Sequence, residues 1–328
     1  MNTEWASLIG MPFCALLIIE RKEAGMKKFF SNKVAIGVFV APALILFIIF
    51  MFIPIVQVFI YSFSEWNGIK EPVFNGITNY TKLFTDRVFV TAHRNQFIFA
   101  IFITVFQMVM ATILAITISN KRIKGRKFLR VSYFIPVVLS VTVVCQLWMS
   151  IFNDTGLLNQ LFRALGFEFS QNWLGDRYKS IYVIAFVNAW QWMGYQFALI
   201  LAGIKSIPDD YYEAAQIDGA TNLQAHTRIT IPLLAETYKF CLIISLTGGI
   251  KAFTEMFIMT KGGPGTSTYT LTYLMYTAAF KRGQYGYGLA AAAVMILECM
   301  AVMMVINYIF RDKDEEKSRR KIKHEKTA

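Results

Sequence analysis

The chain has 328 residues, of which 55% are hydrophobic and only 16% are charged, and its formal net charge is +12. A soluble domain of this length carries more charge and fewer apolar residues, so the composition indicates a membrane protein. The basic residues cluster in short segments beside apolar runs. This placement is typical of membrane topology signals and argues against a nucleic-acid-binding surface.

The first 25 residues fit neither a membrane span nor a secretory signal. Their apolar stretch LIGMPFCALLII is too short to cross a bilayer, and it is preceded by Glu4 with no basic residue. Met26 is followed by Lys27 and Lys28, which suit the start of a first span. We interpret residues 1–25 as a translation-start artefact or a peripheral cytoplasmic segment, and not as a seventh span.

Six apolar segments are long enough to cross a bilayer as helices, which takes about 20 residues each. The sequence therefore predicts an all-α membrane protein with six transmembrane helices, at 34–63, 96–119, 131–152, 181–204, 236–260 and 286–310. The predicted organisation is a cytoplasmic N-terminal segment, a first span with its external loop, a core of five spans and a charged cytoplasmic tail. These parts cover 1–33, 34–95, 96–310 and 311–328.

The distribution of Lys and Arg predicts the orientation of these spans. The segment NKRIKGRKFLR between the second and third spans holds six basic residues and no acid, which places it in the cytoplasm. Alternation then puts both termini and the 205–235 loop on the same side. The predicted cytoplasmic segments together carry 21 Lys and Arg, and the predicted external loops carry 10.

In the predicted external loop 153–180, the amphipathic piece LLNQLFRAL predicts a short connecting helix.

The fourth span carries a polar and aromatic stripe. Its members recur mostly three and four residues apart and are Asn188, Gln191, Trp192, Tyr195 and Gln196. Amides that bond hydroxyl groups and rings that stack on apolar sugar faces suit a pathway for a neutral sugar. The alternative is that these residues hold neighbouring helices together.

The loop between the fourth and fifth spans reads EAAQIDGATNLQAHTRITIPLL from Glu213 to Leu234. Acids in the first turn predict a short helix that ends near Gly219, and a second helix would follow before Pro232. Asp218 could cap that second helix or pair with a basic residue of a partner. The loop is either a docking element on the cytoplasmic face or an ordinary solvated connection.

Charged residues inside spans five and six are costly and indicate either a partner or a water-filled cavity. Lys251 and Glu255 are four residues apart, which allows a mutual ion pair or a place in the pathway. Glu298 lies near the middle of the sixth span and is expected to form hydrogen bonds within the bundle or with a second subunit.

No motif in the sequence indicates that this chain binds a cofactor or a metal. The stretch KGGPGTST has glycines but lacks the Lys of a nucleotide-binding loop. The three histidines, His93, His226 and His324, are scattered, and Cys14, Cys145, Cys241 and Cys299 show no ligand spacing.

The loop EAAQIDGA followed by ITIPLL resembles the cytoplasmic signature loop of permease subunits of binding-protein-dependent ABC importers. The flanking LAGIKSIPDDYYEAAQIDGATNLQ and MTKGGPGTSTYTLTYLMYTAAF resemble the carbohydrate branch, of the maltose and multiple-sugar type, and the likeness covers about 96–310. The matching residues are Glu213, Ala214, Ala215, Asp218, Gly219, Ala220, Ile229 and Pro232. An aromatic residue, usually Phe, is common in the family where this chain has His226.

This resemblance implies an inner-membrane transport subunit of a bacterial cell, with a loop that couples to a separate ATPase. The implied partners are a second homologous permease, two ATP-binding subunits that hold ATP and Mg, and an extracytoplasmic sugar-binding protein. The substrate would be a sugar or oligosaccharide, and the chain itself would not be an enzyme. The alternative is an ion-coupled secondary transporter that uses Lys251, Glu255 and Glu298 as its relay.

Overall fold

The structure is a computed structural model of the chain, and it describes residues 33–120, 123–167 and 170–311. The predicted segment 1–25 and nearly all of the predicted tail 311–328 lie outside these residues. The chain divides into two compact units, residues 1–60 and 61–328. The segment 64–95, predicted to be an external loop, therefore belongs to the same unit as the later spans.

The described part of the first unit is one apolar helix. Two α-helical stretches flank a π-helical stretch and reach just past the unit boundary: Lys33–Phe47 (α3), Ile48–Phe52 (η1) and Ile53–Ser62 (α4). The 27 residues Ile36–Ser62 are long and apolar enough to cross a membrane, in agreement with the predicted span 34–63.

The described part of the second unit is mostly helical, with one antiparallel pair of short strands. The strands are Ser64–Glu65 (β1) and Val73–Phe74 (β2), with Ser64 opposite Phe74. The longer helices are Arg87–Ser119 (α6), Arg126–Val138 (α7), Val141–Phe152 (α8), Ser180–Ser206 (α10), Ala235–Ile250 (α14) and Tyr285–Ile309 (α16). The short elements are Thr78–Thr85 (α5), Leu157–Ala164 (α9), Asp210–Ile217 (α11), Asn222–Ala225 (α12), His226–Thr230 (η2), Ile231–Leu233 (α13), Met256–Thr260 (η3), Leu271–Tyr276 (α15) and Thr277–Lys281 (η4).

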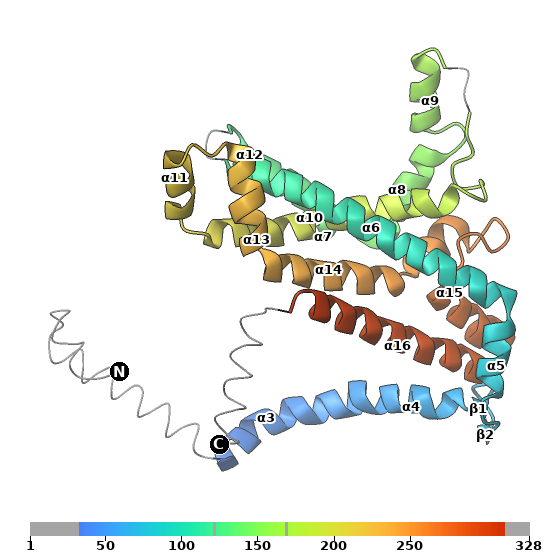
Figure 1. Cartoon of the computed structure of the whole chain (residues 1–328). Helices are drawn as coiled ribbons and strands as arrows, with labels where there is room; N and C mark the ends of the chain where they lie inside the picture. Colours follow the sequence, from blue (N-terminus) through green and yellow to red (C-terminus); the bar gives the residue numbers. More distant parts are fainter. Residues whose placement is uncertain (1–32, 121–122, 168–169, 312–328) are drawn as a thin grey trace. The chain divides into compact units, whose positions relative to one another are not determined.

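The long helices of this unit pack side by side around α6. Helices α10 and α14 lie against α6, and α16 lies against α14, as Figure 1 shows. Small residues let these backbones approach closely, as is common between membrane helices. A Cβ atom added to Gly249 of α14 would lie 2.6 Å from the Cα of Ala100 in α6. The segment α11–α13 lies at one end of the bundle, and α5 lies at the other (Figure 1).

Two of the predicted spans are not continuous helices. The predicted span 131–152 is interrupted at Leu139 and Ser140, which have extended backbone angles between α7 and α8. The predicted span 236–260 stops at Ile250 and resumes as the π-helical stretch η3. Apolar composition alone did not reveal either break, because a sufficiently apolar segment can be continuous or interrupted.

Backbone groups freed at these breaks are bonded within the protein, as a membrane interior requires. The Leu139 carbonyl accepts a hydrogen bond from Gln191 Nε2 at 3.0 Å. The Ala252 carbonyl accepts hydrogen bonds from the hydroxyl groups of Thr270 at 3.2 Å and Thr272 at 2.5 Å. Polar side chains of neighbouring segments therefore stabilise both interruptions.

In the described residues, four helices are apolar and long enough to cross a membrane: Ile36–Ser62, Arg87–Ser119, Val141–Ala164 and Tyr285–Ile309. A fifth is reached if Asn222–Leu233 and Ala235–Ile250, which bend by 70° at their junction, count as one span. Helix α10 matches the predicted span 181–204 in its bounds. It is less apolar than the four helices above, because it carries three amide side chains, and it is therefore not counted among them. The number of six spans and their orientation remain predictions.

The close approach of α14 to α6 gives a stability test with a matched control. Gly249→Ala should destabilise the protein by about 1–3 kcal/mol, because the added methyl group meets the backbone of Ala100. Gly248→Ala should leave stability unchanged or raise it by up to about 1 kcal/mol, because nothing lies within 4 Å of its added Cβ. Thermal unfolding of the two purified variants measures the difference, and equal melting temperatures would contradict this packing.

Candidate functional site

The loop between α10 and α14 forms an elbow of two short helices, which we call the elbow (residues 209–234). Helix α11 carries Asp210 and Glu213 in its first turn, where the helix dipole favours acids. The chain then reverses at Gly219, which has a φ of +79°. The Ala220 amide donates to the Ala215 carbonyl at 2.9 Å, and the Gly219 amide donates to Gln216 at 3.1 Å. These two bonds form a Schellman motif, which explains why a glycine occupies this position.

The second helix of the elbow is capped by Thr221. Its hydroxyl group accepts a hydrogen bond from the Gln224 amide at 3.3 Å, and Gln224 Oε1 accepts from the Thr221 amide at 2.8 Å. This reciprocal arrangement is a capping box. The interpretation of Asp218 as the cap of this helix was therefore wrong: Asp218 ends α11, and its side chain is exposed.

The elbow presents an exposed surface that includes most of the residues expected to couple to a partner. Ala215, Ala220 and Ile229 are half-buried, and the other members, Glu213, Ala214, Asp218, Gly219 and Pro232, are exposed. The sequence analysis overlooked Tyr211, Ile217 and Leu223, whose exposed fractions are 52%, 87% and 73%. Large apolar side chains in a polar loop are a signal for a docking surface, and they could have been found from the sequence.

His226 lies between the two parts of the elbow. Its Nδ1 is 3.0 Å from the hydroxyl group of Thr230, and the same hydroxyl group is 2.8 Å from the Tyr212 hydroxyl group. Partial burial lowers the pKa of His226 below its usual value, which favours the neutral ring. His226 therefore forms a polar link within the elbow itself, and a direct contact to a partner is not needed to explain its polarity.

A cavity of about 350 Å³ lies among α6, α10, α14 and the residues that follow α14. Its polar and aromatic lining includes most of the predicted pathway residues: Asn188, Trp192, Tyr195, Gln196, Lys251 and Glu255. Gln107 of α6 and Ser245 of α14 also line it. Gln107 is the one amide within residues 97–119 of α6, and this isolated position in an apolar stretch is the signal that would have identified it from the sequence.

The buried acid of this cavity is held by an amide. Asn188 Nδ2 donates to Glu255 Oε1 at 2.5 Å, and both side chains are buried. Lys251 is exposed, and no ion pair joins it to Glu255 in the part of the chain that the structure describes. Of the two alternatives for these residues, the mutual ion pair does not form, because α14 ends at Ile250 and the helical spacing between the two residues is lost.

Gln191 was predicted as a pathway residue, and the structure places it outside the cavity. It is buried against the break between α7 and α8, where it bonds the Leu139 carbonyl. Gln196 lines the cavity and also contacts a neighbouring helix, because its Nε2 lies 3.4 Å from the Cys241 carbonyl of α14. The polar stripe of α10 therefore serves both the cavity and the packing of helices.

Glu298 forms hydrogen bonds within the bundle, as expected. Gln96 Nε2 donates to Glu298 Oε2 at 2.5 Å, and His93 Nδ1 lies 3.0 Å from Oε1. These contacts join α6 to α16 and do not reach Glu255. No group of three or more metal-binding side chains occurs among the described residues.

Comparison with known proteins identifies the family of this chain. Residues 107–313 match the family described as "Binding-protein-dependent transport system inner membrane component". The probable ABC transporter permease protein YurN of Bacillus subtilis is 36% identical over 87% of this chain and 99% of its own length. The arabinooligosaccharides transport system permease protein AraP of Bacillus subtilis is 31% identical over 87% of this chain and 91% of its own length.

Solved structures show the same fold. A chain of a bacterial alginate ABC transporter, crystallised with an alginate pentasaccharide-bound periplasmic protein, superposes with a TM-score of 0.76. The match covers 87% of this chain and 96% of the other at 22% sequence identity. The family match, the relatives and this fold agree, and the chain belongs to the family of inner membrane components of binding-protein-dependent transport systems.

Proposed function

We propose that this chain forms the translocation pathway for a sugar or oligosaccharide in an ATP-driven importer. The observation that carries the proposal is the cavity beside α10, whose amides and aromatic rings suit a ligand rich in hydroxyl groups. The relative AraP, named for arabinooligosaccharide transport, supports this substrate class. Asn188 and Glu255 would offer the substrate a hydrogen-bonding pair, and Trp192 and Tyr195 would offer ring faces.

The elbow is proposed to be the element that couples this pathway to ATP hydrolysis. Its exposed small and apolar residues suit a groove on a separate ATP-binding subunit, and ATP and Mg would be bound there. The complete importer would hold two such subunits, a second permease and an extracytoplasmic binding protein. Closure of the ATP-binding subunits would move the elbow and, through α10 and α14, the walls of the cavity.

The proposed setting is the plasma membrane of a bacterium, with six spans and both termini in the cytoplasm. This orientation rests on the 21-to-10 distribution of Lys and Arg. It places the elbow on the cytoplasmic side and α9 outside.

An ion-coupled transporter is less well supported. Such a mechanism needs its charged groups in a chain along which a proton or cation can pass. Glu255 is bonded to Asn188, whereas Glu298 is bonded to Gln96 near His93. The two acids thus belong to separate clusters, and no observation favours a relay between them.

The coupling proposal can be tested with one substitution at two sites. Ala214→Trp places bulk on the exposed face of the elbow, and Ala164→Trp places the same bulk on the exposed face of α9. Ala214→Trp should abolish co-purification of the ATP-binding subunit and lower sugar uptake at least about tenfold, because a close interface has no room for the ring. Ala164→Trp should retain both. Normal uptake by Ala214→Trp at normal membrane abundance would contradict the coupling role.

The role of the cavity beside α10 as the sugar pathway can be tested with variants that affect transport and stability differently. Tyr195→Ala should reduce the uptake rate about fivefold at sugar concentrations well below saturation, because it removes one contact of about 1 kcal/mol to the substrate. Its melting temperature should stay close to that of the parent. Gln191→Leu should show the opposite pattern, with lower stability from the unpaired Leu139 carbonyl and little change in the rate per folded molecule. If Tyr195→Ala transports normally, the cavity is not the pathway.

The orientation can be tested by labelling single cysteines in a chain whose native cysteines are replaced by alanine. Gln160 and Gln216 are both exposed on short helices, α9 and α11. A membrane-impermeant maleimide added to intact cells should label Gln160→Cys and spare Gln216→Cys. Opening the cells should make both reactive, and the reverse pattern in intact cells would invert the proposed topology.

A further inference from the structure

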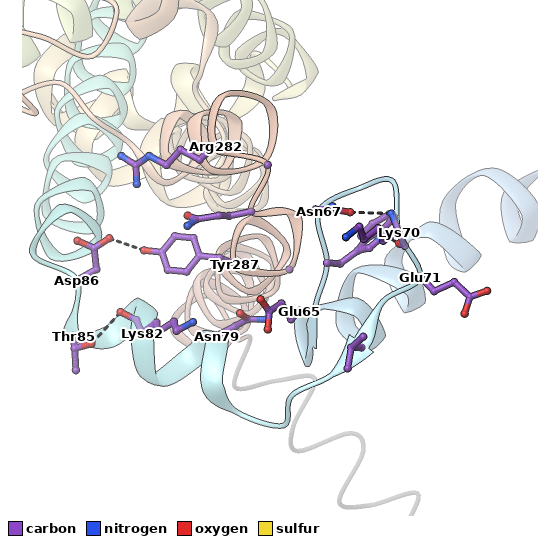
Figure 2. Close-up of a pocket in the computed structure, with 15 residues that line it drawn as sticks. Glu65, Asn67, Lys70, Glu71, Asn79, Lys82, Thr85, Asp86, Arg282 and Tyr287 are labelled. Carbon is purple, nitrogen blue, oxygen red and sulfur yellow. Dashed lines mark hydrogen bonds between the residues drawn. The ribbon is translucent and has the colours of Figure 1, made fainter.

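A second and larger cavity lies at the end of the bundle opposite the elbow. Its volume is about 680 Å³, roughly twice that of the cavity beside α10. Figure 2 shows its walls, which come from the β1–β2 hairpin, from α5 and from the chain just before and within the start of α16. In the proposed orientation this cavity opens on the outside of the membrane.

The walls of this outer cavity are held in place by buried hydrogen bonds. Asn79 of α5 is buried and donates through Nδ2 to the carbonyl groups of Ser62 and Ser64, both at 2.9 Å. The Gly286 amide donates to the Trp66 carbonyl at 3.2 Å, which ties the start of α16 to the hairpin. The cavity is therefore bounded by fixed backbone from three separate segments.

Tyr287 presents a fixed aromatic ring inside the outer cavity. Its hydroxyl group donates to Asp86 Oδ2 at 2.8 Å, as the dashed line in Figure 2 shows. Asp86 Oδ1 in turn accepts from the Val88 amide at 2.8 Å and caps α6. Asp86 thus holds the ring by its polar end, and the ring is only half-buried. A positioned ring of this kind suits the apolar face of a sugar.

Apart from Trp66, Val73 and two glycines, the remaining lining is polar, and it is balanced in charge. Amide side chains come from the hairpin, from α5 and from the residue before α16, namely Asn67, Asn79 and Gln284. The charged lining residues are three acids and three bases: Glu65, Glu71, Asp86, Lys70, Lys82 and Arg282. A cavity for a polyanion would carry a surplus of cations, and this one does not. Its chemistry suits a neutral ligand with many hydroxyl groups.

We propose that the outer cavity binds a neutral oligosaccharide and is a second saccharide site on this chain. The inference rests on the proposed function, because it assumes that the substrate is a saccharide and that this end of the bundle is external. The larger outer volume would receive several sugar units, while the smaller inner cavity would hold fewer. The substrate class is thereby narrowed from sugars in general to neutral oligosaccharides.

The test measures saccharide binding with a fluorescent probe attached next to the outer cavity. A fluorophore is attached to Ile69→Cys, a position on the hairpin that is 92% exposed and does not line the cavity. The permease complex is reconstituted in lipid nanodiscs without its binding protein and titrated with maltotetraose, arabinotetraose and xylotetraose. At least one tetrasaccharide should give a saturable signal. Tyr287→Leu should weaken its binding about tenfold, and Tyr287→Phe, which keeps the ring, by no more than about threefold.

A control shows whether the signal belongs to this cavity. Tyr178→Leu removes an exposed tyrosine of the 153–180 loop that does not line the outer cavity, so this variant should bind as the parent does. No response to any tetrasaccharide, or equal binding by Tyr287→Leu, would overturn the proposal. So would a response only to an added binding protein, which would assign the cavity to protein docking. Because the uptake assay of Tyr195→Ala does not use this signal, either proposal can fail without the other.

Discussion

The second unit depends on one constraint: a backbone carbonyl released where a helix breaks inside the membrane must find a donor within the protein. At the break between α7 and α8 the donor is the amide of Gln191. At the end of α14 the donors are the hydroxyl groups of Thr270 and Thr272. An unpaired carbonyl in hydrocarbon costs several kcal/mol, so these side chains are what make interrupted helices tolerable.

The cavity beside α10 follows from the second of these breaks. Because the helix stops at Ile250, Lys251 and Glu255 no longer share a helical face, and Glu255 turns to Asn188 instead. Close packing on the other side of α14, where Gly249 meets Ala100, holds the broken element firmly against α6. The same short stretch thus combines a tight interface on one side with an open, polar space on the other.

The sequence predicts the helices with regular apolar patterns well and the irregular points poorly. The bounds of α10 and α16 agree with their predicted spans to within two residues. Helix α6 ends where its span was predicted to end, but it begins at Arg87, nine residues before the predicted start at 96, because its first turns carry polar residues. Both short helices of the elbow were also expected, and Gly219 ends the first as predicted. The second was expected to end before Pro232, but its helical stretch continues through α13, which contains Pro232. The breaks in two other spans were not expected, because hydrophobicity does not report backbone angles.

The candidate site shows the same limit at the level of single residues. The stripe on α10 was found from its spacing, but spacing could not tell whether Gln191 faces a cavity or a carbonyl of a neighbouring helix. Of the two roles considered for Asp218, the structure excludes the cap, which Thr221 provides; both residue types favour that position, and only backbone geometry chooses between them. Residues brought together from distant segments, such as Tyr287 and Asp86, leave no local pattern to detect.

The caps of the elbow have a consequence for its proposed docking on an ATP-binding subunit. The Schellman motif at Gly219, the capping box at Thr221 and the Tyr212–Thr230 contact all use groups from the loop itself. A segment that supplies its own caps would need little ordering on docking, so association would lose little conformational entropy. Recognition between the two subunits would then resemble the fitting of rigid bodies, with specificity set by shape and not by coupled folding.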